Sequence, residues 1–297
     1  MSIQLTSISK IYGSQTAVNN LSFSAKKGEI VGFLGPNGAG KSTTMKILTG
    51  YLQPSEGTVL VNDINVVVNP IKAQKNIGYL PEHNPLYLEM YVKEYLHFVA
   101  SIHKINKTEI DVVIDRVGLS QESQKKINQL SKGYRQRVGL AAAIIHNPDV
   151  LILDEPTTGL DPNQLVEIRA LIKELGKDKT VLLSTHIMQE VEAICNRVII
   201  INKGEIVLDE SLSSLKENQE QVITVTFDFK IEEQLLLQLP NSNTAENISD
   251  NSWKLSFSTK TDMRPKLFDF AQEQGLKILE LNSENKNLET LFRELTL

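Results

Sequence analysis

The segment from Gly35 to Thr43 has the residue types and the spacing of a phosphate-binding loop. One glycine is followed by four residues and then by Gly-Lys-Ser, in the run Gly35, Pro36, Asn37, Gly38, Ala39, Gly40, Lys41, Ser42 and Thr43. Glycines let backbone N–H groups turn towards an anion, and the N-terminus of a following helix adds positive potential. Lys41 can reach the outer phosphates of a nucleotide, and the Ser42 hydroxyl can coordinate Mg²⁺.

Two elements must position this loop. The apolar residues 30–34 predict a short buried strand, and residues 44–48 predict a helix. Strand, glycine loop and helix is the order that phosphate binding requires. A glycine-rich turn that binds nothing is the alternative, and the full pattern in this context disfavours it.

Two further predicted strands end in polar residues that suit nucleotide chemistry. The apolar residues 150–153 lead into Asp154 and Glu155, and residues 180–185 lead into His186. Ligands bind at the carboxyl ends of strands in parallel sheets. We therefore expect Asp154 to hold the Mg²⁺ shell, Glu155 to polarise an attacking water and His186 to contact a γ-phosphate. A lone histidine is more often structural, and the neighbouring strand favours the functional interpretation.

Single residues elsewhere are candidates by their position. Tyr12, upstream of the loop, could stack on an adenine base, although a packed aromatic is the common case. Residues 77–82 predict a short strand that ends at Glu82, where a side chain would point at the nucleotide. Asp161 lies in a tight loop after Glu155, and residues 131–137 precede a predicted apolar helix over 138–146.

Composition limits the classes of protein that the chain can represent. It has 297 residues and a net charge of −5, so there is no overall electrostatic case for a nucleic-acid partner. Residues 1–13 show no secretory leader, and no apolar run approaches the roughly 20 residues that span a bilayer. A role at a membrane would thus require another chain. The single cysteine, Cys195, fits a reducing cytoplasm and a small buried side chain.

The remaining periodicities predict how the first 216 residues are organised. Residues 3–9 predict an edge strand and residues 18–24 a second strand, and further antiparallel strands are expected at 58–61 and 64–66. Residues 92–102 and 108–117 have helical spacing, and this helical insertion carries Tyr87, Met90 and Tyr91. Whether these three side chains face a partner or the core stays open.

A second domain is predicted at 217–297, after a polar linker at 216–221. Its expected strands and helices follow the order β-α-β-β-α-β, which suggests a small ferredoxin-like α+β domain. A last amphipathic helix is expected at 288–295. No catalytic constellation is visible in this domain, so we interpret it as regulatory or dimerising.

The segment Leu130-Ser131-Lys132-Gly133-Tyr134-Arg135-Gln136 resembles the LSGGQ signature of ABC-type ATPases. Tyr12 then resembles the A-loop residue, Glu82 the Q-loop position, Asp161 the D-loop and His186 the H-switch, all in family order. The resemblance covers residues 1 to about 215. It implies an α/β P-loop ABC ATPase fold, with a mixed core sheet, an antiparallel β-subdomain and a helical subdomain.

The resemblance also implies partners and cofactors. Two such domains pack head to tail, so Ser131 and Gly133 would contact the γ-phosphate of ATP held by the partner's Lys41. ATP with Mg²⁺ would be held by Ser42, Asp154 and Glu82. ATP closes the dimer, here expected to be a homodimer, hydrolysis opens it, and a separate integral membrane permease changes state. The expected location is the cytoplasmic face of the inner membrane.

The chain departs from the family pattern at three positions. Glu82 stands in place of the Q-loop glutamine, and Lys132 and Tyr134 replace Gly and Gln in the signature. A carboxylate at 82 can still ligate Mg²⁺ or a water, and Ser131 and Gly133 remain. A dead ATPase used as a scaffold is disfavoured because Lys41, Asp154, Glu155 and His186 are all present.

Within the family, the single cassette and appended domain resemble ATP-binding subunits of exporters with a separate permease. Residues 77–87 and 133–140 are similar to the gliding-motility-associated ATPases of Bacteroidetes-type bacteria. Soluble ABC ATPases of ribosomes are the first rival, but they carry two cassettes. ATPases of DNA repair are the second, but they separate the two nucleotide motifs by long coiled coils. A binding module without turnover is the third.

Overall fold

The computed structural model describes residues 1–217, 221–259, 261–285 and 288–296. These residues form two compact units, Met1–Leu212 and Ser213–Leu295. The boundary predicted at 216/217 falls inside helix α8 (Leu212–Glu217). The linker predicted at 216–221 therefore starts within a helix, and residues 218–220 lie outside the described residues.

The centre of the first unit is a six-stranded mixed sheet with the order β10-β9-β3-β8-β7-β6. Its strands are β3 (Ile30–Leu34), β6 (Ile77–Leu80), β7 (Val150–Asp154), β8 (Thr180–Thr185), β9 (Arg197–Asn202) and β10 (Glu205–Ser211). All pairs are parallel except β10 with β9. Every residue of β3, β7 and β8 is buried, as expected for strands covered on both faces. Their carboxyl ends meet at one edge of the sheet.

A second, antiparallel sheet has the order β2-β1-β4-β5. Its strands are β1 (Ile3–Tyr12), β2 (Gln15–Ala25), β4 (Glu56–Val61) and β5 (Ile64–Asn65). Residues of this sheet form one apolar core with Val31, Phe33 and Met45. The prediction that residues 3–9 form an edge strand is wrong, since β1 pairs with both β2 and β4. Alternation along a strand shows which face is buried, whereas it carries no information on how many edges are paired.

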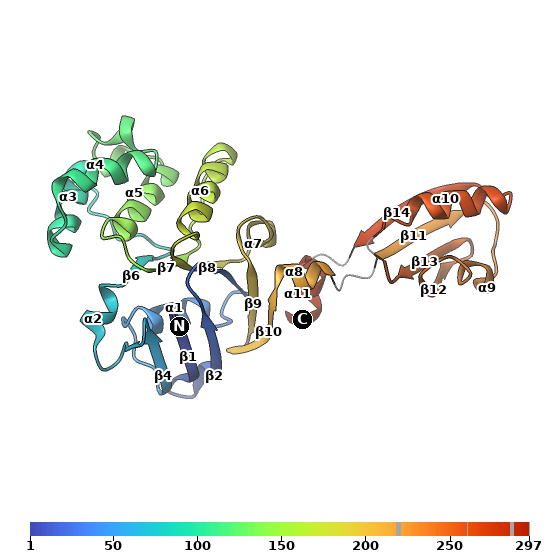
Figure 1. Ribbon diagram of the computed structural model, residues 1–297, viewed down its shortest axis with the longest axis horizontal. Coiled ribbons are helices and arrows are strands. Elements are labelled where there is room, and N and C mark those ends of the chain that lie inside the picture. The colour runs from blue at the N-terminus through green and yellow to red at the C-terminus, as the bar shows by residue number, and fades with distance from the viewer. Residues whose placement is uncertain (218–220, 260, 286–287, 297) are drawn as a thin grey trace. The chain divides into compact units, whose positions relative to one another are not determined.

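Helices pack around these sheets (Figure 1). They are α1 (Lys41–Leu48), α2 (Pro70–Gln74), α3 (Val92–His103), α4 (Lys107–Arg116), α5 (Lys132–Ile144), α6 (Pro162–Leu175) and α7 (Met188–Ile194), with 3₁₀ turns η1 (Ser120–Glu122) and η2 (Ile127–Gln129). Helix α5 begins six residues before the predicted start at 138. The Ser131 hydroxyl accepts a bond from the Tyr134 N–H at 3.4 Å and caps the helix. The segment that resembles the ABC signature therefore contains the N-cap and the first turn of α5.

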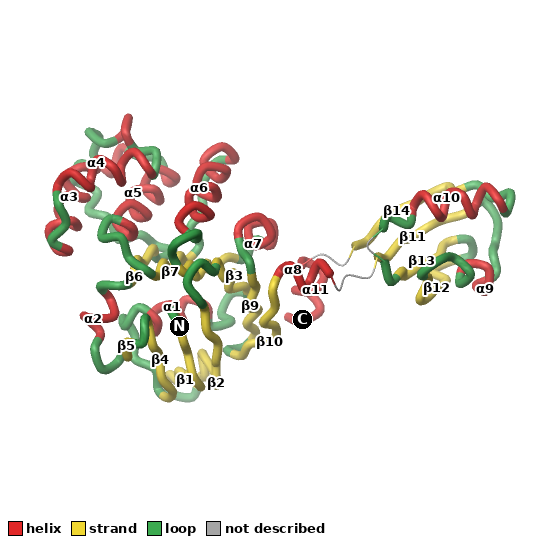
Figure 2. The backbone as a smooth tube through the Cα atoms, viewed as in Figure 1, coloured by secondary structure: helices red, strands yellow, loops and turns green. Residues whose placement is uncertain are grey.

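The second unit is a four-stranded antiparallel sheet with the order β12-β13-β11-β14 (Figure 2). Its elements are β11 (Gln221–Phe227), α9 (Glu233–Leu236), β12 (Ser242–Ser249), β13 (Ser252–Phe257), α10 (Arg264–Glu273), β14 (Ile278–Asn285) and α11 (Leu288–Thr296). The element order agrees with the prediction, although α9 has only 4 residues. The ferredoxin-like classification stays a prediction. Among the described residues of both units, no helix has the length and apolar character to cross a membrane.

Candidate functional site: a phosphate loop facing two strand ends

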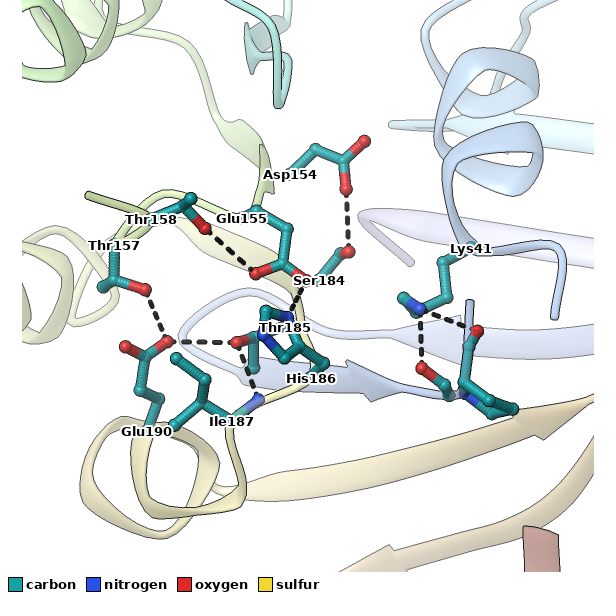
Figure 3. Close-up of polar contacts among 12 residues, drawn as sticks. Lys41, Asp154, Glu155, Thr157, Thr158, Ser184, Thr185, His186, Ile187 and Glu190 are labelled. Carbon is teal, nitrogen blue, oxygen red and sulfur yellow. Dashed lines mark hydrogen bonds and ion pairs between the residues drawn. The ribbon is translucent and has the colours of Figure 1, made fainter. Parts of the chain in front are cut away.

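Lys41 is the first residue of α1, and its ammonium group is bound by the loop that precedes it. Nζ donates to the carbonyl oxygens of Gly35 at 2.6 Å and Pro36 at 3.0 Å (Figure 3). Burial lowers the pKa of Lys41, and the carboxylates of Glu155, Asp154 and Glu82 oppose this shift. A charged group held by neutral carbonyls in a buried place can exchange them for phosphate oxygens, which bind a cation more strongly.

Two glycines explain why the loop has this shape. A Cβ at Gly35 would lie 2.5 Å from the carbonyl oxygen of Ile201, and a Cβ at Gly40 would lie 2.5 Å from that of Ala17. Gly40 also has φ 106°, in the left-handed region. The backbone of β9 and β2 thus packs directly behind the loop, and no side chain fits at either position.

Asp154 ends β7 and is buried, with the Ser184 hydroxyl donating to Oδ1 at 2.7 Å. Ser42 lies in the first turn of α1. Mg²⁺ in nucleotide sites takes oxygen ligands from one or two protein groups and the rest from phosphates and water. An aspartate and a hydroxyl in these positions suit that chemistry. Glu82, the third predicted ligand, follows β6 as an exposed side chain.

Glu155 and His186 follow the adjacent strands β7 and β8, where Asp154 pairs with Ser184. The Nδ1 atom of His186 lies 2.8 Å from Oε1 of Glu155, and the Thr158 hydroxyl donates to Oε2 at 3.4 Å. A carboxylate can only accept hydrogen bonds, so Nδ1 carries the proton. Figure 3 draws this pair in one view with Asp154 and Lys41, and the carboxylates of Glu155 and Asp154 act electrostatically on the Lys41 ammonium group. The structure thus brings together the four residues predicted to act on the outer phosphates.

The backbone at Glu155 is unusual. Its φ is 50°, in the left-handed region that residues other than glycine rarely occupy. Its N–H donates to the carbonyl oxygen of Ser184 at 3.0 Å, and its carbonyl oxygen accepts from Nε2 of Gln136 at 3.4 Å. Such strain persists only when the surroundings over-determine it, and it concentrates at functional sites.

The remaining predicted residues are engaged within their own elements. Ser131 caps α5, and Asp161 caps α6, where its Oδ1 accepts from the Gln164 N–H at 2.9 Å. Gly133 is buried because the Gln164 side chain packs against it, so Gln164 joins the α5 and α6 termini. Tyr12 is half exposed at the end of β1, with Lys10 Nζ 5.1 Å from its ring centre.

Sequence reasoning missed three polar residues around these groups. Burial, together with nearby Asp154 and Glu82, raises the pKa of Tyr79 to about 12. Gln136 joins the first turns of α5 to Glu155, and Glu190 is fully buried in α7. Gln136 lay within the segment that resembles the signature, so its position was a usable signal. Nothing in the sequence distinguished Tyr79 or Glu190.

Comparison with known proteins identifies the family. Residues 18–158 match the family described as ABC transporter. Over 99% of this chain and 95% of the relative, the sequence is 34% identical to the uncharacterised ABC transporter ATP-binding protein YhcH of Bacillus subtilis (strain 168). The chain belongs to the ABC transporter ATP-binding proteins. This ABC protein is also 32% identical to the bacitracin transport ATP-binding protein BcrA of Bacillus licheniformis, over 99% of the chain and 96% of the relative.

A solved structure shows the same fold. The dimeric, post-hydrolysis ATP-binding cassette MJ0796, bound to ADP and Pi, superposes with a TM-score of 0.66 at 27% identity, covering 71% of this chain and 98% of that one. The prediction of a P-loop ABC ATPase fold is confirmed. This ABC protein binds ATP, and it is an ATPase whose activity is coupled to transport.

Proposed function

We propose that this protein is the ATP-hydrolysing subunit of an exporter whose permease is a separate polypeptide. The observation that carries the hydrolytic part is the 2.8 Å contact between His186 and Glu155 beside the loop of Lys41. In this proposal the Glu155 carboxylate polarises the attacking water, and His186 contacts the γ-phosphate. Lys41 binds the outer phosphates, and Tyr12 stacks on the adenine.

Ser42 and Asp154, with Glu82, would hold Mg²⁺. The ion would neutralise charge on the phosphates and fix their orientation. The protein itself supplies the phosphate loop and two buried carboxylates. The loop backbone from Gly35 to Thr43 cradles the phosphates, and burial at the carboxyl end of β7 keeps Asp154 and Glu155 each in one orientation. Preorganised charges of this kind are the main source of catalysis in phosphoryl transfer.

The proposed active form is a head-to-tail dimer, with two copies of this chain as the simplest form. Ser131 is exposed at the N-terminus of α5, a helix of 13 residues, where backbone N–H groups and the helix dipole favour an anion. In this arrangement Ser131 and Gly133 bind the γ-phosphate held by the partner's Lys41, and Asp161 lies at the subunit contact. The dimeric state of the MJ0796 cassette supports this proposal.

The proposed permease contact is an aromatic surface that we define by Tyr87, Tyr91 and Phe98, which are 56%, 48% and 41% exposed. Tyr87 contacts Phe98 edge to face at 5.7 Å between ring centres. Met90 instead packs against the apolar core. Of the three side chains whose surroundings the sequence left open, Tyr87 and Tyr91 are thus exposed and Met90 faces the core. Large exposed aromatics favour a partner protein, and they follow β6 and Glu82 along the chain. This contact would place the protein at the cytoplasmic face of the inner membrane.

Export is supported by the relative named for bacitracin transport. A role in gliding motility stays a finer proposal that rests on residues 77–87 and 133–140 alone, since the relatives reported above are not named for it. Neither the named relative nor these two segments identifies the cargo.

The test is a pull-down of the tagged Glu155→Gln protein from gently solubilised native membranes in the presence of ATP. Glu155→Gln should hold ATP without hydrolysing it, and the closed dimer should retain its membrane partner. Recovery of a multi-spanning protein, lost when Lys41→Ala is added as the control, supports the proposal. Recovery of ribosomes or DNA without a membrane protein would overturn it in favour of a soluble ABC ATPase.

A further inference from the structure

Glu190 is a buried carboxylate that the proposed mechanism does not use. It lies in the first turn of α7 and is 0% exposed. One of its oxygens, Oε2, accepts hydrogen bonds from two threonine hydroxyls, Thr157 at 2.6 Å and Thr185 at 3.1 Å. Figure 3 shows the three side chains joined next to the Glu155–His186 pair.

The two threonines come from the segments that carry the proposed catalytic residues. Thr157 is two residues after Glu155, in the loop between β7 and α6. Thr185 is the last residue of β8 and directly precedes His186. The Thr185 hydroxyl also accepts from the N–H of Ile187 at 3.1 Å, so one hydroxyl contacts the backbone on the far side of His186. A single carboxylate oxygen therefore joins the Glu155 loop to the His186 turn.

The energetic cost of this arrangement indicates that it is more than packing. Burying a carboxylate is expensive unless it is paired and hydrogen-bonded. Here Arg169 is paired with the carboxylate only at long range, with its Nη2 atom 3.8 Å from the other oxygen, Oε1. Within the described residues Oε1 has no hydrogen-bond partner. An apolar side chain would avoid this cost, but it could not accept from both hydroxyls.

We propose that Glu190 is a positioning residue that fixes Glu155 and His186 relative to each other through Thr157 and Thr185. The inference rests on the proposed roles of Glu155 and His186. In this role Glu190 contacts neither the nucleotide nor the attacking water. Its loss leaves two buried hydroxyls without an acceptor and frees the two segments to separate, and displacements near 1 Å at a reacting centre cost up to about 10²-fold in rate.

The experiment compares single and double threonine variants with a matched control in the full-length protein. Thr157→Val and Thr185→Val remove the two donors and keep the side-chain shape. Thr180→Val is the control, because Thr180 is also buried, also in β8, and also donates one hydrogen bond, to the Lys26 carbonyl at the opposite strand end. Glu190→Ala and Glu190→Gln complete the set, since a glutamine amide oxygen can still accept from both hydroxyls.

The threonine double variant and Glu190→Ala should lower kcat for ATP hydrolysis by about 10- to 100-fold. Their ATP affinity should change by less than about threefold, because the Lys41 loop is untouched. Glu190→Gln should recover most of the rate, and Thr180→Val should behave as wild type. Wild-type kcat in the double variant, or an ATP affinity that falls as far as kcat, would overturn the proposal.

Amide hydrogen exchange of the same proteins gives a reading that does not depend on turnover. Exchange at residues 157–159 and 186–189 should become faster in the double variant than in Thr180→Val. Unchanged exchange in the double variant would overturn the positioning role, whether or not the protein hydrolyses ATP. A wild-type protein that hydrolyses no ATP would instead count against the proposed function. Should Glu190→Ala fail to fold, the threonine variants carry both measurements.

Discussion

His186 donates from Nδ1 to Oε1 of Glu155 over 2.8 Å, although 59% of the histidine side chain is exposed and the carboxylate is buried. One member of the pair is thus fixed by the protein, and the other is open to a ligand. Because Nδ1 holds a proton, only Nε2 remains for a ligand, as an acceptor in the neutral ring and as a donor in the imidazolium.

His186→Ala should lower kcat for ATP hydrolysis by about 10²- to 10³-fold, the range typical of removing one hydrogen-bonding group that stabilises developing charge on the phosphate. ATP binding should remain, since Lys41 and its loop are unchanged. Phosphate release at saturating ATP and an equilibrium ATP titration separate these effects. His97→Ala, on α3, is the control, and equal phosphate release by His186→Ala and the wild type would remove His186 from its role.

Lys41→Ala should weaken ATP binding by about 10- to 100-fold, because it removes one charge-assisted contact worth about 1.5–3 kcal/mol. Lys46 is the matched control, five residues later in the same helix and exposed. Lys46→Ala should bind ATP as the wild type does in isothermal titration. Equal affinities in the two variants would argue against the phosphate-loop assignment.

The head-to-tail dimer predicts complementation between two inactive proteins. Lys41→Ala impairs the phosphate loop, and Ser131→Glu places a negative charge where a γ-phosphate would bind. A mixed dimer still contains one site made from an intact loop and an intact signature. Random mixing of equal amounts should therefore restore about a quarter of wild-type ATPase activity, since half the dimers are mixed and each keeps one of two sites. No recovery despite proven subunit exchange would contradict the shared site.

His146 should make the folded state sensitive to mild acid. Its ring stacks on His103 at 4.0 Å between centroids, and Nε2 donates to the carbonyl oxygen of Ile77 at 3.0 Å. Burial, assisted by His103, lowers the pKa of His146 to about 4. Between an unfolded-state pKa near 6.5 and this value, the unfolded chain binds a proton that the folded chain does not, so stability falls as pH falls.

The ring is partly open to solvent, so we expect this residue to account for only about 1 kcal/mol between pH 7 and pH 5. His146→Gln keeps a donor for the Ile77 carbonyl and does not titrate. Urea unfolding at the two pH values should show a smaller loss of unfolding free energy for His146→Gln than for the wild type. An identical loss in both proteins would show that the proton binds elsewhere.

The apolar strands of the core could be predicted closely from the sequence. β3 and β8 have the predicted bounds, and the buried run of β3 lies between the charged Glu29 and Gly35. Helix α5 could not be delimited, because its first turn is polar and its burial depends on the neighbouring α6. The edge position of β1 was wrong for a similar reason, since strand neighbours are chosen by tertiary packing.

The residues of the candidate site also differ in whether the sequence predicts them. Asp154 ends a buried strand, and Lys41, Glu155 and His186 follow buried strands, so topology alone brings these residues together. Glu190 gave no comparable signal, because a glutamate in a short helix ordinarily faces solvent. Its burial follows from the hydroxyls of Thr157 and Thr185, and those contacts join segments about 30 residues apart.

The left-handed backbone at Glu155 restricts how this position can change during evolution. Glycine, asparagine and aspartate accept a φ near 50° most readily. Glycine and asparagine lack the carboxylate, and aspartate is one methylene shorter than the side chain that meets His186. A substitution of Glu155 therefore either strains the backbone of this turn or loses the carboxylate contact with His186. Selection on backbone conformation and selection on hydrolysis thus act on the same codon.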